Sequence, residues 1–388
     1  MPPSVYAGRI ERPLSITGLG MLSTLGDGPA AHLDAISRNS PAFRPLSGLL
    51  GAGSPHAATP AGWIEQRELL THRKWSPASM AALHVARQAI AAAGWTPEDC
   101  RPAAVVVGTS RGNAAGWLSP WPGRRPFKLM AASNTIHSEP AAAITIELGI
   151  HGPYHVLASG CSAGLDALGI ATLLVRSGVV PRALAVAVDL PLVPLLLDSY
   201  AASGLLASAP QVDPYHPSSA GFIPGEGAAA IAIDATRSGT PWILDYTANS
   251  DACDPIGIPK DGGGSGDLLI AARGRHGDPA ALCPHATGTA VHAVAEPAAL
   301  IRAFESTHLP TLHFLKPFTG HTIGASGLLE TAILAAFLQQ KKLPPNPRGL
   351  ATPPDFIAPD TALDADGTVF KLSHSMGGHN ALLVLSPP

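Results

Sequence analysis

One cysteine stands where a thiol could do covalent chemistry. Cys161 lies in segment 155–177, which begins as an apolar strand, turns at Ser159-Gly160 and continues as a helix of small and apolar residues. A thiol at a helix start faces free N–H groups and the positive end of the helix dipole, and both favour the thiolate. A buried structural cysteine is the competing interpretation. The strand–turn–helix setting favours a nucleophile.

Two histidines lie in loops of small residues at the ends of strands, where α/β proteins place their sites. His285 lies in segment 284–289, Pro-His-Ala-Thr-Gly-Thr. His321 lies in segment 316–327, Lys-Pro-Phe-Thr-Gly-His-Thr-Ile-Gly-Ala-Ser-Gly. Because the chain has 16 histidines, either residue on its own is more often structural than catalytic.

Composition excludes several classes of protein. A net charge of −3 argues against a nucleic-acid-binding surface. Only 14% of the residues are charged, while 40 are glycine and 39 are proline, which indicates a compact, loop-rich enzyme rather than a disordered chain. The four cysteines form no CxxC pair and predict reduced thiols; they are Cys100, Cys161, Cys253 and Cys283. We find no signal peptide and no spanning apolar run, so we expect a cytoplasmic protein.

Strands alternate with helices along the chain, which predicts an α/β layered fold. We expect strands at 103–108, 182–189, 227–234 and 311–315, and helices at 76–94, 297–307 and 325–340. The strand–turn–helix segment around Cys161 resembles the segment around His321. This internal similarity predicts two related halves, 1–235 with the nucleophile and 236–388 with the histidines, that present loops to a shared cleft.

Five segments match one protein family in order. They are Cys161-Ser-Ala-Gly, Gly221-Phe-Ile-Pro-Gly-Glu-Gly-Ala, the segments that contain His285 and His321, and Met376-Gly-Gly-His-Asn. In this order the chain resembles the β-ketoacyl-(acyl carrier protein) synthases from about residue 14 to residue 386. The resemblance implies a thiolase-like αβαβα sandwich, no metal, no organic cofactor, and a homodimer or a heterodimer with a second ketosynthase-like subunit.

The resemblance implies a role for each matched side chain. Cys161 would take an acyl group from a carrier thioester, and decarboxylation of a malonyl thioester would supply the second nucleophile. His285 and His321 would donate hydrogen bonds to the resulting enolate. Lys316 would support the second histidine, and Glu330 would be the buried partner of Lys316.

The resemblance also implies roles for residues around this centre. The backbone N–H groups of Cys161 and Met376 would form the oxyanion hole, and His374 and Met376 lie in the segment that gates the acyl pocket in the family. Thr287 and Thr289 would support the histidine loop. A basic patch comprises Arg124, Arg125 and Lys128. In the family the matching stretch meets the acidic carrier protein. The alternative is that these side chains are only a solvated surface.

The chain departs from the family pattern at several positions. Ala286 replaces glycine and Ala293 replaces aspartate, although Glu296 is kept. Segment 373–378, Ser-His-Ser-Met-Gly-Gly, replaces a pattern of aromatic residues around a glycine, and His379 replaces a small hydroxyl residue. These changes favour a specialised synthase of a polyene or polyketide pathway over general fatty acid elongation.

Two other functions stay open on the sequence. A non-catalytic subunit of the chain-length-factor kind would usually lack the cysteine that this chain keeps. A thiolase-like acyltransferase would need a second cysteine near the C-terminus, and none follows Cys283. A zinc site through Cys283 and His285 would need further ligands at suitable spacing. Chain length, starter unit and pathway are not fixed by these residues.

Overall fold

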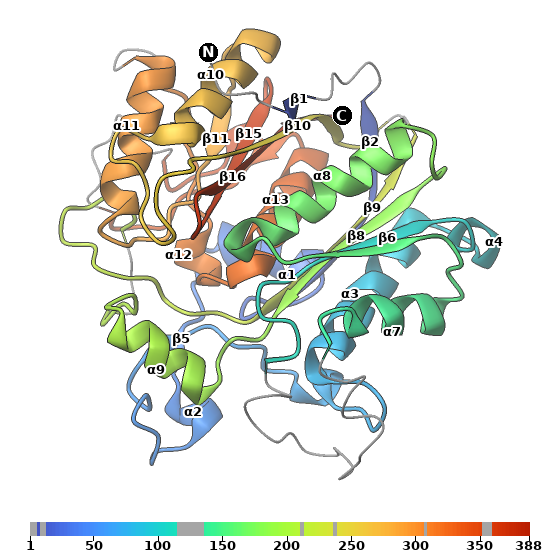
Figure 1. The fold of residues 1–388 in the computed structure, drawn as a ribbon, viewed down its shortest axis with the longest axis horizontal. Coiled ribbons are helices and arrows are strands. Elements are labelled where there is room, and N and C mark those ends of the chain that lie inside the picture. Colours follow the sequence, from blue (N-terminus) through green and yellow to red (C-terminus); the bar gives the residue numbers. More distant parts are fainter. Residues whose placement is uncertain are drawn as a thin grey trace.

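The computed structural model of the protein describes residues 6–7, 13–114, 136–209, 213–235, 239–305, 309–350 and 359–388 (Figure 1). Its main sheet is twelve-stranded, and the pairing of β10 with β2 joins two halves of it. The first half has the order β2 (Leu14–Ser23), β9 (Gly227–Asp234), β8 (Ala183–Asp189), β6 (Ala104–Gly108), β7 (Tyr154–Leu157). The second half has the order β10 (Trp242–Ser250), β16 (His379–Ser386), β15 (Val369–Ser375), β11 (Ala281–Cys283), β12 (Thr311–Leu312).

The two halves of the sheet repeat one pairing pattern. In the first, β2–β9 and β9–β8 are antiparallel, and β8–β6 and β6–β7 are parallel. In the second, β10–β16 and β16–β15 are antiparallel, and β15–β11 and β11–β12 are parallel. This match confirms the expected construction from two related halves. The exact boundary at 235/236 stays a prediction.

Two helices form the middle layer, between the halves of the sheet (Figure 1). They are α8 (Ala163–Arg176) and α13 (Ser326–Gln339). Glycines let them approach closely: a Cβ added to Gly164 would lie 2.7 Å from Gly324 O, and one added to Gly327 would lie 2.9 Å from Leu165 Cβ. This close contact brings the starts of the two helices together.

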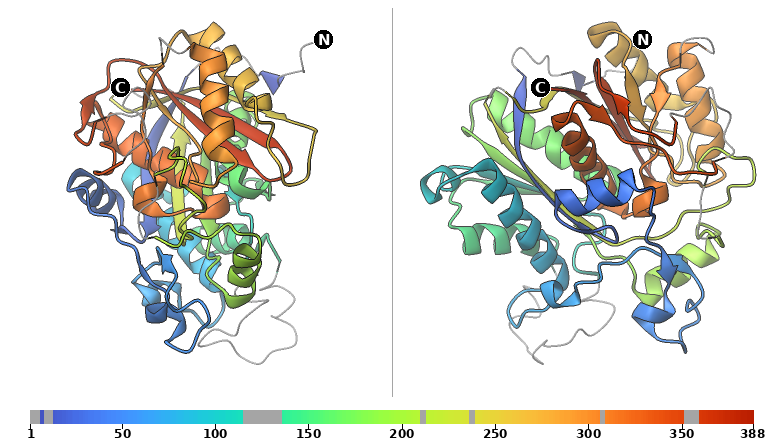
Figure 2. Two further views of the ribbon diagram at one scale, coloured as in Figure 1. Left: turned by 90° about the vertical axis from the view of Figure 1, so that its left-hand side faces the viewer. Right: turned by 180° about the vertical axis from the view of Figure 1, so that it is seen from behind.

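Two outer layers complete the sandwich (Figure 2). Helices α3 (Pro77–Ala93) and α7 (Glu139–Leu148) cover the first half of the sheet, and α10 (Gly263–His276) and α11 (His292–Phe304) cover the second. Separate apolar cores lie under each outer pair and around the middle helices. The layers therefore run α, β, α, β, α, as expected.

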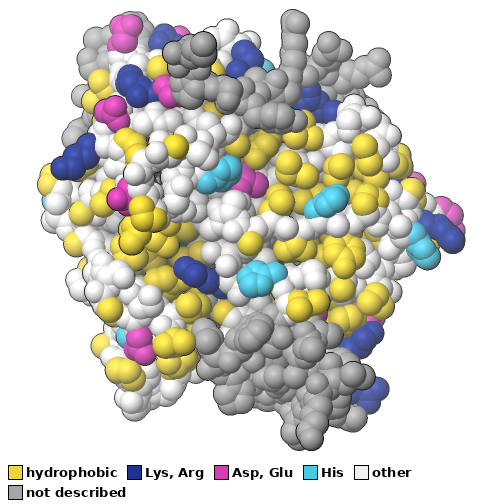
Figure 3. Space-filling view, viewed as in Figure 1, with side chains coloured by type: hydrophobic (Ala, Val, Ile, Leu, Met, Phe, Trp, Pro, Cys, Tyr) yellow, Lys and Arg dark blue, Asp and Glu magenta, His cyan; other side chains and the backbone are white. Residues whose placement is uncertain are grey.

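Short elements lie in the connections and at the edges. They are β1 (Tyr6–Ala7), β3 (Gly26–Asp27), α1 (Pro29–Ser37), β4 (Arg44–Pro45), α2 (Ser47–Leu50), β5 (Pro60–Ala61), η1 (Arg67–Leu70), α4 (Pro97–Cys100), α9 (Pro194–Ala202), α12 (Lys316–Thr319), β13 (Lys342–Leu343) and β14 (Leu363–Asp364), where η denotes a 3-10 turn. Across the described residues, every helix is too short or too polar to cross a bilayer. The face in Figure 3 carries hydrophobic side chains with isolated histidines and few charged groups among them.

Candidate active site

Equivalent turns of the two halves hold Cys161 and His321. Strand β7 leads into η2 (Gly160–Ser162) and then α8, while β12 leads through α12 to η3 (Ile323–Ala325) and then α13. A Cβ added to Gly324 would lie 3.0 Å from Gly160 O, so the turns meet only because this residue is glycine. Ile323 adopts a φ of 50°, which is strained for a β-branched residue. The backbone next to Cys161 is therefore strained at Ile323.

Three side chains from the two halves converge. The Cys161 Sγ atom lies 3.3 Å from Nε2 of His321. One nitrogen of His285, one nitrogen of His321 and Cys161 Sγ all lie within 4.8 Å of one another. The two imidazole centroids are 5.4 Å apart, with ring planes at 89°. The structure therefore brings together the three residues that the sequence singled out; atoms at this spacing could also ligate a transition-metal ion such as Zn²⁺.

The orientation of His321 is fixed on both sides of its ring. Nδ1 lies 3.0 Å from the Ser326 hydroxyl oxygen, which also accepts the backbone N–H of Thr322 at 3.0 Å. The Phe222 ring meets His321 edge-on, with centroids 5.0 Å apart. With Nδ1 held by Ser326, Nε2 is directed at Cys161, where it can accept the thiol proton.

Burial decides the protonation of this centre. It raises the pKa of Cys161 to about 11, although Lys316 and Arg111 oppose the rise. Burial, reinforced by Lys316, holds the pKa values of His285 and His321 well below the usual value. At neutral pH the resting site therefore contains a thiol and two uncharged imidazoles. Burial of Cys161 thus favours the thiol, whereas its place before α8 was expected to favour the thiolate.

A buried ionic network supports the histidine loop. Lys316 Nζ donates to the backbone oxygen of His285 and lies 2.7 Å from Oε1 of Glu330. Lys371 Nζ lies 2.7 Å from Oε2 of Glu330 and donates to the oxygen of Leu372 at 2.7 Å. Sequence reasoning found Lys316 and Glu330 but missed Lys371. Its one signal was a lysine inside the otherwise apolar start of β15.

Glu296 holds the backbone of the same loop. Its carboxylate accepts the N–H groups of His285 and Ala286, both at 2.7 Å. Burial would raise the pKa of Glu296, but His374, His292 and the loop amide lower it to about 2. Ala286 has a φ of 46°, in the left-handed region, which is the conformation that favours the glycine of the family pattern.

Two further imidazoles surround His285, so the site is rich in histidine. The His292 and His374 ring centroids lie 5.0 Å and 5.6 Å from that of His285. His292 Nδ1 lies 2.8 Å from the hydroxyl oxygen of Thr289, which is 3.3 Å from that of Thr287. Within the described part of the chain, His285 Nδ1 and His292 Nε2 have no hydrogen-bond partner. Sequence reasoning did not single out His292.

The residues of the gate segment, 373–378, differ in their burial. His374 is buried with Nε2 3.4 Å from Glu296, whereas Met376 lies at the tip of the β15–β16 turn and is 49% exposed. Between them, the Ser375 hydroxyl accepts the backbone N–H of Cys161 at 3.1 Å. The expected docking residues Arg124, Arg125 and Lys128 lie outside the described residues.

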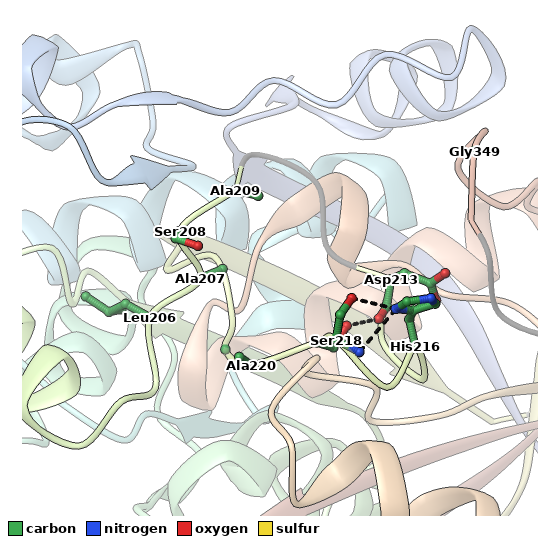
Figure 4. A pocket seen from close by; sticks show the side chains of 11 residues that line it. Leu206, Ala207, Ser208, Ala209, Asp213, His216, Ser218, Ala220 and Gly349 are labelled. Atoms are coloured by element: carbon green, nitrogen blue, oxygen red, sulfur yellow. Dashed lines mark hydrogen bonds between the residues drawn. The ribbon is translucent and has the colours of Figure 1, made fainter.

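A cavity of about 340 Å³ lies in the loop region before β9 (Figure 4). Residues 206–209, 213, 216, 218–221 and 349 line it, without Cys161, His285 or His321. Leu206 also packs against the apolar cluster that contains Cys161 and Phe222. The backbone N–H of Gly221 donates to Gly288 in the histidine loop at 3.0 Å. The cavity therefore adjoins the wall of the site.

Comparison with protein families now identifies the chain. The model described as beta-ketoacyl synthase, N-terminal domain, matches residues 11–237, and that of the C-terminal domain matches residues 243–349. The chain belongs to the beta-ketoacyl synthase family. Membership confirms the resemblance seen in the sequence and makes the chain an acyl-transferring condensing enzyme.

Relatives come from polyketide and fatty acid biosynthesis. The tetracenomycin polyketide synthase ketoacyl synthase alpha subunit of Streptomyces glaucescens is 26% identical over 97% of this chain and 98% of its own length. A putative polyketide beta-ketoacyl synthase 1 of Streptomyces virginiae is 31% identical over 63% of each chain. The 3-oxoacyl-[acyl-carrier-protein] synthase 2 of Staphylococcus aureus is 27% identical over 62% of this chain and 65% of its own length.

Solved structures share the fold. One solved structure is a type II PKS acyl-carrier protein in complex with its ketosynthase bound to the hexaketide. A chain of this complex superposes with a TM-score of 0.83 at 23% identity, over 97% of this chain and 99% of that one. A chain of the ishigamide ketosynthase/chain length factor superposes with a TM-score of 0.85 at 22% identity, over the same shares. The thiolase-like fold expected from the sequence is thereby confirmed.

Proposed function

We propose that this chain is a ketosynthase that makes a β-ketoacyl thioester by decarboxylative Claisen condensation. The observation that carries the proposal is the 3.3 Å approach of Cys161 Sγ to Nε2 of His321, with His285 in the same buried centre. Family membership supplies the reaction class, and the arrangement of these three groups supplies a role for each.

Acylation is the first step. The Cys161 sulfur attacks the carbonyl carbon of a carrier thioester while His321 Nε2 takes the thiol proton. The carbon–sulfur bond to the carrier arm breaks, and the departing carrier thiolate takes up the proton that His321 Nε2 accepted. The acyl group is then held on Cys161 as a new thioester.

Condensation is the second step. A malonyl thioester loses CO₂, and the electron pair of the broken C–C bond forms an enolate. Neutral His285 and His321, the latter now in the tautomer with its proton on Nε2 and with Nδ1 accepting from Ser326, donate hydrogen bonds to the enolate oxygen. Loss of one such donor costs on the order of 10²–10³ in rate. The enolate carbon attacks the acyl-enzyme carbonyl, Cys161 leaves as the thiolate and recovers a proton, and a β-ketoacyl thioester results.

The supporting groups hold this centre in place. Lys316, paired with Glu330, donates to the backbone oxygen of His285, and the hydroxyls of Thr287 and Thr289 lie 3.3 Å apart within the same loop. The N–H groups of Cys161 and Met376 would receive the oxyanion, with the Ser375 hydroxyl displaced from the N–H of Cys161 by the substrate. His374 and Met376 would gate the acyl chain.

The partner is an acyl carrier protein. The basic patch of Arg124, Arg125 and Lys128 would steer its acidic surface, and the cavity in Figure 4, which has polar and apolar lining residues, would receive part of its arm. Strand β7 ends the sheet with Tyr154 at 45% exposure, which leaves an edge for a second ketosynthase-like subunit. We assign the protein to the cytoplasm and its halves to residues 1–235 and 236–388.

A chain-length-factor-like subunit is the second candidate. The name of one structural relative contains such a factor. However, a non-catalytic subunit would not need a buried thiol close to two imidazoles, and this chain contains all three groups. The catalytic function is therefore the better supported one.

Intact-mass analysis after incubation with acyl-carrier thioesters tests the proposal. We expect one added acyl group on the wild-type chain and none on Cys161→Ala. The matched control is Cys253→Ala, because Cys253 is exposed and outside the centre; this variant should be acylated as the wild type is. A chain that purifies only with another subunit, and stays unacylated at Cys161 in that complex, would support the second candidate instead.

A further inference from the structure

Beside Cys161, the wall built by the first half of the chain contains two polar groups that have no hydrogen-bond partner among the described residues. Cys161, Tyr200 and Phe222 belong to one apolar cluster with Ile323. The Tyr200 ring meets the Phe222 ring edge-on at 5.5 Å, and Phe222 in turn meets His321. Tyr200 is only 4% exposed. A tyrosine hydroxyl has therefore been buried one side chain away from the nucleophile.

Arg111 reaches the same place from the loop after β6. Its guanidinium carbon lies 5.7 Å from the centre of the Tyr200 ring. The backbone N–H of Arg111 donates to Oδ1 of Asp189 at 2.8 Å, and the N–H of Gly324 donates to Oδ2 at 2.7 Å. Asp189 thus ties the Arg111 loop to the turn that carries His321. The position of Arg111 is set by the same contacts that build the centre.

One polar atom of each side chain is unsatisfied. Considering only the residues that the structure describes, Arg111 Nε and the Tyr200 hydroxyl are buried without a hydrogen-bond partner. The nearest carboxylate, Asp189, is occupied by backbone N–H groups and by the Thr109 hydroxyl. Burial raises the pKa of Tyr200, and the neighbouring Arg111 guanidinium opposes this rise.

Buried polar groups in native proteins are almost always paired, because an unpaired donor loses its hydration without compensation. Two unpaired donors beside a nucleophile indicate that a bound ligand supplies the missing hydrogen-bond acceptor. The ligand must offer an acceptor oxygen. A plain alkyl chain would leave both donors unsatisfied, and a site built in this way discriminates strongly against such an analogue.

We propose that Arg111 and Tyr200 form a specificity subsite for acyl groups that carry an acceptor oxygen, a carbonyl or a carboxylate, close to the thioester held on Cys161. The inference rests on the proposed acylation of Cys161 and adds the substrate class. An oxygen placed against Arg111 Nε and the Tyr200 hydroxyl is bound, and a saturated acyl group of equal length is disfavoured.

Competition between three pantetheine thioesters of similar length tests the subsite. The full chain is offered butanoyl, acetoacetyl and succinyl thioesters, and the rate of Cys161 acylation is followed by intact mass. We expect acetoacetyl or succinyl to exceed butanoyl about tenfold or more. A preference for acetoacetyl identifies a carbonyl ligand, and a preference for succinyl identifies a carboxylate. Preference for butanoyl overturns the inference.

Two variants separate the subsite from general damage. Arg111→Met keeps the length of the side chain without its donors, and Tyr200→Phe keeps the ring without the hydroxyl. Both should reduce the ratio of oxygenated to butanoyl acylation, Arg111→Met about tenfold or more. The matched control is Arg87→Met on the exposed side of α3, which should preserve the ratio. Equal losses for all three thioesters in both variants would assign the pair to folding and contradict the subsite.

Two outcomes distinguish this inference from neighbouring ones. If no thioester acylates Cys161 in the wild type, the proposed function itself fails, and the subsite with it. If Arg111→Met slows decarboxylation of malonyl-pantetheine in a Cys161→Ala background while the acyl ratio is unchanged, Arg111 serves the extender unit, and the acyl subsite is wrong.

Discussion

Lys371 Nζ lies 2.7 Å from Oε2 of Glu330 in a region where Lys371 is wholly buried and Glu330 is 1% exposed. Lys316 occupies the other carboxylate oxygen at 2.7 Å. Glu296, beneath the same loop, supplies a second negative charge. Two lysines and two glutamates therefore compensate one another inside the second half of the chain, directly under His285.

Removal of Lys371 should destabilise the fold, because it leaves this buried group with excess negative charge. Loss of one partner from a buried ion pair costs about 3–5 kcal/mol. We expect Lys371→Met to lower the free energy of unfolding by that amount, measured by urea denaturation at pH 7. The matched control is Lys342→Met, since the Lys342–Asp364 pair has side chains 46% and 69% exposed and should contribute less than about 1 kcal/mol. Equal effects of the two variants would contradict the buried network.

Alkylation of Cys161 should respond steeply to pH. With a pKa of about 11, the thiol is protonated throughout the neutral range. Only the thiolate reacts, so the rate should rise about tenfold per pH unit between roughly pH 6 and pH 9 without a plateau. Iodoacetamide labelling followed by intact mass measures this, with Cys161→Ala giving the background from Cys253. A plateau below about pH 8 would mean that the helix dipole outweighs burial after all.

Acid should destabilise the chain through its buried histidines, and His32 is a clear case far from the active centre. Its Nδ1 lies 2.9 Å from Gly28 O and its Nε2 lies 2.8 Å from the Ser23 hydroxyl, an arrangement that suits a neutral ring. Burial lowers its pKa to about 4. Because the unfolded chain binds the proton more readily, stability present above about pH 6.5 is lost as the pH falls towards 4.

Replacement of this imidazole should flatten that dependence. Between pH 6.5 and 5, His32 alone should account for about 2 kcal/mol of lost stability. In His32→Gln the fall in unfolding free energy over this range should shrink by that amount, whatever the stability at pH 7. The exposed residue His151 provides the control, and His151→Gln should keep the wild-type slope. An unchanged slope in His32→Gln would show that His32 is not held neutral.

Much of the fold was predictable from periodicity, because long buried segments have few alternative structures. Strand β9 has the expected bounds, and the expected helix at 325–340 is α13. The helix expected at 297–307 instead begins at His292, since Pro297 is accommodated within α11 rather than at its start. Because the expected helix began too far along the chain, the helical position of His292 was missed, although its ring centroid lies 5.0 Å from that of His285.

Cys161, His285 and His321 could be singled out from the sequence because each lies in a distinct local motif. Lys371 and Arg111 could not, because their roles depend on contacts between distant segments. Lys371 is opposite Cys283 in the β11–β15 pairing, which sets it beside Glu330 of α13. Arg111 meets Tyr200 only through the packing of α9 against the centre. A single sequence contains no record of such pairings.

The contact between α8 and α13 should be intolerant of a single methyl group. A Cβ on Gly164 would lie 2.7 Å from Gly324 O and 3.0 Å from the backbone N of Leu328, and neither atom can move without shifting a helix start. Gly164→Ala should therefore cost about 1–3 kcal/mol in unfolding free energy. It should also slow Cys161 acylation, because the strain separates the turns that carry Cys161 and His321.

Gly274 provides the matched comparison for this substitution. It lies in α10, and a Cβ there would meet no atom within 4 Å. Gly274→Ala should raise stability by roughly 0.5–1 kcal/mol, because alanine loses less backbone entropy in a helix, and should leave acylation unchanged. Thermal melts and acylation rates of the two variants test both effects. If Gly164→Ala were as stable and active as Gly274→Ala, the two helices would not need this close contact to align the thiol with His321.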